Sequence, residues 1–237
     1  MIRVLAVSDR VQEHIYSPSV RSRYSDIQVV FGCGDLPVYY LEYIVSALSR
    51  VPVLYVRGNH DDHPVYMSNG RVARRAEGCL DLDGQVVFQS GLYVAGIEGA
   101  MRYRPDGACM YNDRQIAVKL LQMAPRLCLI RLLHGRYLDV LVTHAPPFGI
   151  HDRSDLAHTG FKPFLPFMRC FRPRYLLHGH VHNYNPTAVT QSRYHRTFVI
   201  NVYPYVVVDI PLVASRSARS RVRGWLEAQN GRRADRG

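Results

Sequence analysis

The stretch Val51-Pro52-Val53-Leu54-Tyr55-Val56, followed after Arg57 by Gly58-Asn59-His60-Asp61, decides the fold of this chain. The apolar residues predict a buried β-strand, and the Gly-Asn-His-Asp tetrapeptide predicts a polar loop at its carboxyl end, where ligands bind in α/β sheets. Asn offers a neutral oxygen to a metal ion, and His offers an imidazole that binds metal or moves a proton. Taken alone, the tetrapeptide fits a polar turn that caps a helix equally well. Whether the tetrapeptide belongs to a ligand site or to a simple turn therefore depends on the residues at the ends of the other predicted strands.

Two earlier apolar runs end in the same way. Residues 2–8 form a near-continuous apolar run that leads to Asp9, and residues 27–32 form another that leads to Gly34-Asp35. Between residues 41 and 48, apolar residues recur at the spacing of one helix face. The order strand, helix, strand predicts a βαβ unit with parallel, buried strands.

Two later runs end in histidines. Residues 138–142 lead to Thr143-His144, and residues 175–177 lead to a stretch that contains His180 and His182. These two histidines lie two positions apart, so on an extended segment they share one face. Each polar residue alone has an ordinary role as a cap or turn residue, but the carboxyl ends of strands in a sheet converge. The combination of carboxylates, an amide and histidines therefore predicts a metal site.

The remaining pattern gives several expectations about secondary structure. Asp83-Gly84 between short apolar runs predicts a hairpin over residues 80–88. Asn112 predicts the start of a helix that Pro125 ends, and two prolines shorten or kink a later helix near residues 161–168. Strand-like runs complete the predicted core at residues 187–190, 197–202 and 205–210.

Length and composition favour one domain. The chain has 237 residues, 47% of them hydrophobic, and shows neither a repeat nor a Gly-rich phosphate loop. Residues 1–214 are predicted to form this domain. Residues 215–237 hold seven arginines and contribute five of the eleven net positive charges. They are predicted to form a flexible, solvated tail, with nucleic-acid contact as the less favoured alternative.

Several features predict a cytoplasmic protein without membrane association. The N-terminus leads straight into a strand-like run and lacks the pattern of a signal peptide. No apolar run approaches the ~18 residues of a membrane span. The five cysteines are scattered and form no Cys-x-x-Cys pair, as expected for reduced thiols.

Taken in order, these motifs resemble those of a known superfamily. The set is similar to the ordered motifs of the calcineurin-like metallophosphoesterases, over residues 4 to about 182, and consists of Asp9, Gly34-Asp35, Gly58–Asp61, Thr143-His144 and Gly179–His182. The resemblance implies an α/β fold, a four-layer α/β/β/α sandwich with two central mixed sheets. It also implies a dinuclear metal centre at the strand ends and hydrolysis of phosphoric esters.

The resemblance assigns roles to the motif residues. One metal ion would be held by Asp35, Asn59, His144 and His180, and the other by Asp9, Asp35 and His182, with Asp35 as the bridge. His60 would face the substrate phosphate and leaving group, Asn59 would also contact substrate, and Asp61 would orient His60. The ions would turn water into a hydroxide near neutral pH for in-line attack on phosphorus. Mixed oxygen and nitrogen ligands suit Mn or Fe, with Zn as a further option.

One position departs from the superfamily pattern. The first motif is usually Asp-x-His, and here it reads Asp9-Arg10-Val11. Valine cannot bind metal, so the sequence predicts one firm metal site and a second, weakened one that contains Asp9 and His182. Glu13, His14 or water stay open as replacement ligands.

The leading interpretation is a metal-dependent phosphoesterase. It would act on a small phosphorylated substrate, a phosphodiester or phosphomonoester, with His60 assisting, and resemblance to the small bacterial members favours the diester. Two alternatives remain: a non-catalytic scaffold protein, suggested by Val11, and a nuclease, suggested by the net charge of +11. No nucleic-acid-binding domain is evident in the sequence, so nucleic acid is the less favoured partner.

Two polar loops near the predicted strand ends stay open between an ordinary surface role and contact with substrate. They contain His151, Asp152, Asp155 and His158, and Glu98, Arg102 and Arg104. The histidines interpreted as structural are His63, His134, His178 and His195.

Overall fold

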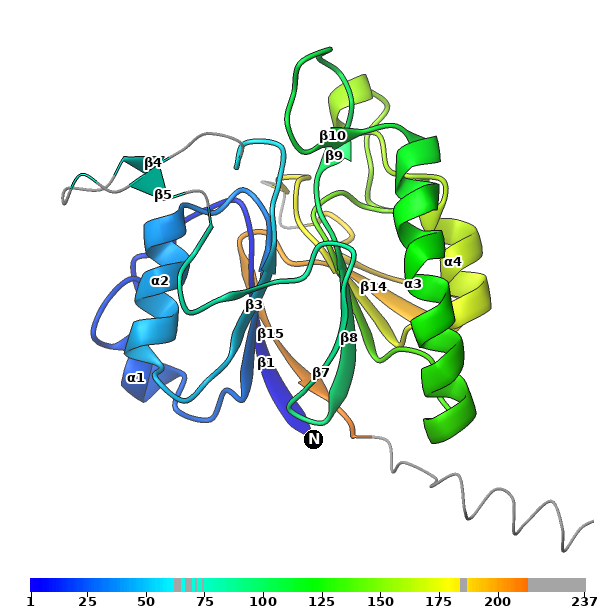
Figure 1. Cartoon of the computed structure of the whole chain (residues 1–237). Coiled ribbons are helices and arrows are strands. Elements are labelled where there is room, and N and C mark those ends of the chain that lie inside the picture. Colours follow the sequence, from blue (N-terminus) through cyan, green and yellow to red (C-terminus); the bar gives the residue numbers. More distant parts are fainter. Residues whose placement is uncertain (62–64, 67–69, 71, 74, 184–186, 213–237) are drawn as a thin grey trace, which may run out of the picture.

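The structure, a computed structural model, shows two β-sheets packed face to face between helices (Figure 1). The residues it describes are 1–61, 65–66, 70, 72–73, 75–183 and 187–212. His63 and the predicted tail at 215–237 lie outside the described residues. The boundary of the domain at residue 214 therefore stays a prediction.

The first sheet is mixed and contains the motifs of the N-terminal half. In spatial order it consists of β15 (Tyr205–Ile210), β1 (Ile2–Val7), β2 (Val29–Cys33), β3 (Val53–Val56) and β6 (Leu80–Asp81). The last four strands run parallel, whereas β15 pairs antiparallel with β1, with Val4 opposite Val208. Buried parallel strands are expected to be apolar throughout, and every residue of β2 and β3 is buried.

The second sheet is also mixed. In spatial order it consists of β13 (Gln191–Tyr194), β14 (Thr197–Asn201), β12 (Tyr175–His178), β11 (Val140–Thr143), β8 (Leu92–Ile97) and β7 (Val86–Gln89). The inner strands run parallel, and the edge strands β13 and β7 are antiparallel to their neighbours. Two short ribbons accompany the sheets: β4 (Val65–Tyr66) with β5 (Val72–Ala73), and β9 (Ala100–Met101) with β10 (Met110–Tyr111).

Helices cover the outer face of each sheet. Against the first sheet lie α1 (Val20–Arg23) and α2 (Val38–Ala47), and against the second lie α3 (Asp113–His134) and α4 (Phe164–Phe171), as Figure 1 shows. Between the sheets, side chains such as Phe31 and Leu54 share one apolar cluster with Val142 and Leu177. The predicted four-layer sandwich is therefore confirmed. No helix among the described residues is long and apolar enough to cross a membrane.

Helix α3 extends further than Pro125 predicts. It begins with a capping box, in which the Asn112 side chain accepts from Gln115 N at 2.9 Å, and ends at Gly135 with φ 78°. The expectation that Pro125 ends the helix is wrong. Pro125 is exposed, while the buried stripe continues at Leu127, so packing on the sheet outweighs one lost hydrogen bond.

The predicted hairpin at Asp83-Gly84 is also wrong. Strand β6 pairs with β3 in the first sheet, whereas β7 pairs with β8 in the second, so Asp83-Gly84 lies where the chain crosses between sheets. The hairpin is instead β7–β8, closed by Ser90-Gly91 with φ values of 50° and 81°. Two positive φ values suit a two-residue hairpin turn.

The strand expected at residues 187–190 lies further along the chain. Residues 187–190 contain no strand, and the edge strand that pairs with β14 is β13. Its polar residues alternate between exposed and half-buried positions, so this strand contains no run of apolar residues that would predict it. The other two runs, and the short helix near residues 161–168, are confirmed.

We expect Leu177→Ala to destabilise the protein by about 3 kcal/mol, because Leu177 is fully buried between the sheets and truncation leaves a cavity. The matched control is Leu121→Ala on α3, where the leucine is 69% exposed, and this change should stay within about 0.5 kcal/mol. Urea unfolding monitored by circular dichroism measures both. Equal effects of the two substitutions would contradict the layered packing.

Candidate metal centre

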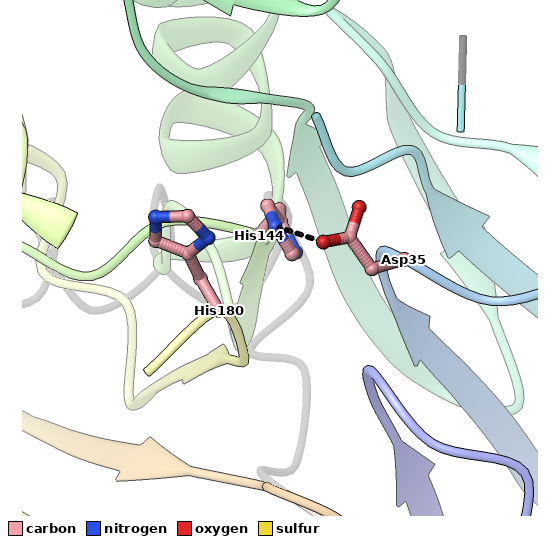
Figure 2. Close-up of side chains that lie close together, drawn as sticks. All are labelled: Asp35, His144 and His180. Carbon is pink, nitrogen blue, oxygen red and sulfur yellow. Dashed lines mark ion pairs between the residues drawn. The ribbon is translucent and has the colours of Figure 1, made fainter. Parts of the chain in front are cut away.

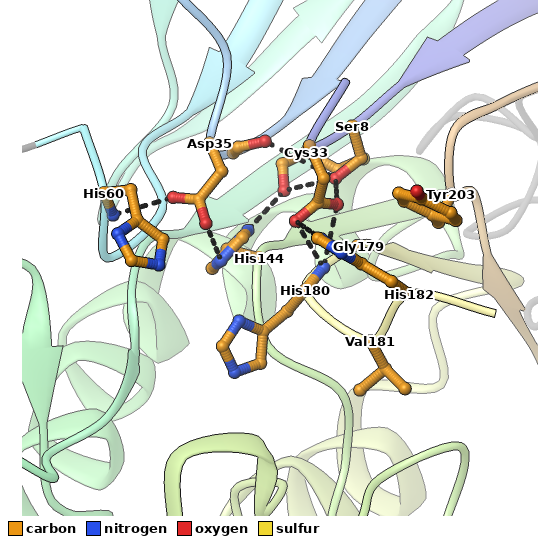
Figure 3. Close-up of polar contacts among 12 residues, drawn as sticks. Ser8, Cys33, Asp35, His60, His144, Gly179, His180, Val181, His182 and Tyr203 are labelled. Carbon is orange, nitrogen blue, oxygen red and sulfur yellow. Dashed lines mark hydrogen bonds and ion pairs between the residues drawn. The ribbon is translucent and has the colours of Figure 1, made fainter. Parts of the chain in front are cut away.

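The predicted site residues lie together at the carboxyl ends of strands from both sheets, and Figure 3 shows five of them: Asp35, His60, His144, His180 and His182. Three of them adopt a left-handed backbone: Asp9 with φ 61°, Asp35 with φ 52° and His180 with φ 66°. Such a backbone costs a non-glycine residue on the order of 1–2 kcal/mol, and it recurs at functional sites. Each of the three residues lies two positions after the end of its strand, in the turn by which the chain leaves the sheet.

The centre of the cluster consists of Asp35, Asn59 and His144. His144 Nε2 lies 3.3 Å from Asp35 Oδ2 and 3.1 Å from Asn59 Oδ1. His180 faces the same point, since one ligand atom each from Asp35, His144 and His180 lie within 4.8 Å of one another (Figure 2). The structure thus brings together the four residues predicted for the firm metal site.

The spacing of these atoms fits a shared metal ion. Two ligand atoms about 2.1 Å from one ion, at tetrahedral or octahedral angles, lie about 3.0–3.4 Å apart. The distances from His144 Nε2 to Asp35 and Asn59 fall in this range. A carboxylate, an amide oxygen and imidazoles form a donor set for a transition metal such as Mn, Fe or Zn.

Hydrogen bonding fixes the orientation of His144. Its Nδ1 lies 2.8 Å from the Cys33 carbonyl oxygen, which only accepts, so Nδ1 carries the hydrogen and Nε2 faces Asp35. Burial lowers the pKa of His144, but the Asp35 charge outweighs it and raises the pKa to about 9. Burial also raises the pKa of Asp35, yet the His144 cation holds it well below the usual range. Positive charge at this point therefore stabilises the buried carboxylate.

His180 offers a neutral ligand. Burial, followed by the neighbouring His144 cation, lowers the pKa of His180 to about 4. Its Nε2 donates to the Ala157 carbonyl oxygen at 2.7 Å, which leaves Nδ1 for a metal ion. The His158 ring lies 5.0 Å from the His180 ring, so the loop after β11 borders the site. Nothing in the residue type of Ala157 signals this contact, because the backbone makes it.

Asp9 and His182 form the second part of the site. His182 Nε2 lies 3.2 Å from Asp9 Oδ1, and the His182 ring stacks on Tyr203 with centroids 4.4 Å apart. Asp9 also accepts from His180 N at 3.0 Å and from the Ser8 hydroxyl. Gly179 permits this approach, since a Cβ there would overlap Ser8. The two residues predicted for the weakened site are therefore adjacent.

Among the described residues, neither Glu13 nor His14 replaces the histidine that the superfamily pattern has at position 11. Val11 is half-buried and packs on the apolar cluster under α1 and α2. His14 Nε2 hydrogen-bonds to Tyr24 Oη at 3.0 Å, and Glu13 is exposed. Among the described contacts, none joins either side chain to Asp9.

His60 and Asp61 have different environments. The His60 side chain is exposed, and its backbone N donates to Asp35 Oδ1 at 2.8 Å. Asp61 is nearly buried and accepts from the backbone N of Asp35 at 2.7 Å and of Gly58 at 2.8 Å. Within the described residues, no hydrogen bond joins the Asp61 carboxylate to the His60 imidazole. Asp61 therefore joins the loop that contains Asp35 to the loop that contains Gly58. Burial, followed by the Asp35 charge, raises the pKa of Asp61 to about 7.

The two loops left open by the sequence have mixed roles. Glu98 is buried and ion-paired to Arg57 at 2.8 Å and to Lys119 at 3.2 Å, and Arg102 donates to the Met110 carbonyl. These contacts are structural. His151 lies 3.0 Å from His178. The same loop contacts the site through the His158 ring, the Ala157 carbonyl and Arg153, which donates to the His182 carbonyl at 2.6 Å.

Comparison with known proteins agrees with this geometry. A family model described as calcineurin-like phosphoesterase matches residues 26–184. One solved structure superposes with a TM-score of 0.60 at 15% identity, covering 87% of this chain and 94% of that chain. The crystal structure of TT1561 of Thermus thermophilus gives a TM-score of 0.56 at 14% identity, covering 85% and 88%. At these identities both likenesses concern the fold alone. No curated protein matches the chain.

We expect two unequal classes of Mn²⁺ site in the chelator-stripped protein, measured by isothermal titration calorimetry. Asp35→Asn should weaken the tighter class at least about 100-fold, because it removes the carboxylate common to both ion positions. Asp9→Asn should affect mainly the weaker class, since the Asp9 carboxylate lies against the His182 imidazole and contacts the tighter group through the backbone N of His180.

The control for charge removal is Asp26→Asn, which neutralises an exposed carboxylate paired with Arg3 and should leave both classes unchanged. Two equally tight Mn²⁺ equivalents in the unmodified protein would show that Val11 does not weaken a site.

Proposed function

The chain belongs to the calcineurin-like phosphoesterase family, and from this membership we propose that it is a metal-dependent phosphoesterase that hydrolyses a phosphodiester or phosphomonoester. The observation that carries the proposal is the convergence of Asp35, Asn59 and His144 on one point, with His60 exposed beside it. A carboxylate, amide and imidazole held this closely suit a cation, and the neighbouring exposed imidazole of His60 suits a reacting ester.

The metal ligands are assigned within this proposal. A tighter ion would be held by Asp35, Asn59, His144 and His180, and a weaker one by Asp9, Asp35 and His182. Divalent ions bound there would polarise the phosphoryl oxygens and lower the pKa of water toward 7. The donor set favours Mn or Fe, with Zn as a further option.

His60 is the proposed catalytic residue. Its backbone N is anchored on Asp35 Oδ1, which fixes the start of the side chain beside the metal ligands, while its imidazole stays open to solvent. A protonated imidazole in this position can stabilise negative charge on the leaving oxygen or donate a proton to it. Asp61 acts as a positioning residue, because it holds the backbone of Asp35 and Gly58 rather than the substrate.

A cavity beside His60 supports a small anionic substrate. Its volume is about 280 Å³, and it is lined by His60, Asp35, Arg57 and Arg75 together with apolar side chains such as Leu36. Arg57 is paired with Glu98 and Arg75 lies 3.6 Å from Asp81, and the remaining N–H donors of the two guanidinium groups suit a phosphate ester. The apolar part leaves room for an organic group on the second oxygen of a diester, which is the substrate class we favour.

One observation favours a second candidate, a non-catalytic binding protein. Val11 packs in the apolar layer and gives the weaker ion position no nitrogen ligand at this point. A chain that has lost metal-dependent turnover would tolerate such a change. The two candidates differ in whether His60 matters to any reaction.

We expect His60→Ala to lower Mn²⁺-dependent hydrolysis of bis(p-nitrophenyl) phosphate about 10²–10⁴-fold, because it removes an acid or cation at the leaving oxygen. Mn²⁺ affinity should stay within about twofold, since the His60 side chain is not among the proposed ligands. The measurement is the release of p-nitrophenolate at saturating Mn²⁺, with p-nitrophenyl phosphate run in parallel.

The matched control is His195→Asn, which removes an exposed histidine with φ 52°, a conformation that Asn tolerates. It should leave the rate unchanged. Absence of turnover in the unmodified, Mn²⁺-loaded protein would support the non-catalytic candidate. Turnover at equal rates in His60→Ala and the unmodified protein would instead show that His60 is not a catalytic residue.

A further inference from the structure

A second cavity lies at the opposite end of the second sheet. Its volume is about 240 Å³, and it is lined by Arg131, Arg136, Arg172, Arg174, Arg196 and a single carboxylate, Asp139. Asp139 and His144 flank strand β11 at its two ends. At about 3.3 Å per residue, the cavity is therefore about 16 Å from the metal centre.

The five arginines reach this cavity from separate parts of the chain. Arg131 belongs to the last turn of α3, Arg136 precedes β11, and Arg172 and Arg174 precede β12. Arg196 lies in the turn between β13 and β14. The amino ends of parallel strands meet at this edge, so the topology gathers the guanidinium groups just as it gathers the metal ligands at the other edge.

The single carboxylate is already engaged. Asp139 is fully buried and lies 3.1 Å from Arg136 Nη1 and 4.0 Å from Arg174 Nη1, and its other oxygen accepts from Tyr93 N at 2.8 Å. Five guanidinium groups against one carboxylate give the lining a net charge of +4. Like charges gathered in one cavity repel one another, and an anion bound among them would offset this repulsion.

Local contacts account for only part of the cluster. Arg131 donates to the Gly135 carbonyl and Arg172 Nε to the Arg169 carbonyl at 3.4 Å, so each also supports a helix end. Arg196 is exposed, and no hydrogen bond joins its guanidinium to another described residue. The planar donor forks of the exposed arginines stay partly available to a ligand with several oxygens.

We propose that this arginine-lined cavity binds a compact anion with more than one phosphate group, either free or attached to a small organic group. The excess of charge matches a diphosphate better than a single carboxylate, and the volume admits a small ligand. The site is separate from the metal centre and does not rest on the proposed hydrolase function.

The test measures pyrophosphate binding to the full chain by isothermal titration calorimetry. The protein is stripped of metal with EDTA and then dialysed free of chelator, so that neither metal-held phosphate nor hydrolysis contributes. The double variant Arg172→Gln/Arg196→Gln removes two exposed cavity arginines and spares the buried pairs with Asp139. Its pyrophosphate affinity should fall about tenfold or more, with an unchanged circular dichroism spectrum.

The matched control is Arg232→Gln/Arg233→Gln, which removes the same charge from the C-terminal part of the sequence and should change affinity less than about twofold. A parallel titration with ADP separates the two sources: binding of ADP with the same loss in the cavity variant indicates a phosphorylated organic ligand, and binding of pyrophosphate alone indicates free diphosphate. Equal losses in the two double variants, or no binding of either probe, would overturn the proposal.

Discussion

The contact of His144 with the first sheet is the interaction on which the rest of the site depends. His144 follows a strand of the second sheet, yet its Nδ1 donates to the Cys33 carbonyl and its Nε2 faces Asp35, both at the end of β2. The ring is fully buried, so it cannot adjust by moving into solvent. Gly34 has φ 90°, and a Cβ there would overlap the ring, which is why glycine precedes Asp35.

This geometry requires strained backbone conformations at three of the site residues. Asp9, Asp35 and His180 all take positive φ values, and each such residue costs on the order of 1–2 kcal/mol. The apolar layer between the sheets stabilises the strands that carry them, since residues such as Leu54 and Val142 are buried there. The strained turns persist because they are short and are attached to strands that cannot shift without exposing this layer.

Much of this arrangement is readable from the sequence, for a physical reason. Buried parallel strands are apolar throughout, so the polar residue that ends each run is conspicuous, as with Asp35 and His144. Features set by contacts between distant segments are not readable: the chain crosses between sheets at Asp83-Gly84, and an exposed Pro125 sits within α3. The carbonyl of Ala157 on His180 leaves no sequence signal at all, because any residue supplies a carbonyl.

The same topology explains why the two ends of the second sheet differ in chemistry. Every parallel strand has its carboxyl end at one edge and its amino end at the other, so residues that follow strands meet at one place and residues that precede them meet at another. Strand β11 connects both, with Asp139 before it and His144 after it. Carboxylates and imidazoles gather at the first edge and suit cations, whereas guanidinium groups gather at the second and suit anions. One buried strand thus lies between the proposed cation site and the proposed anion site.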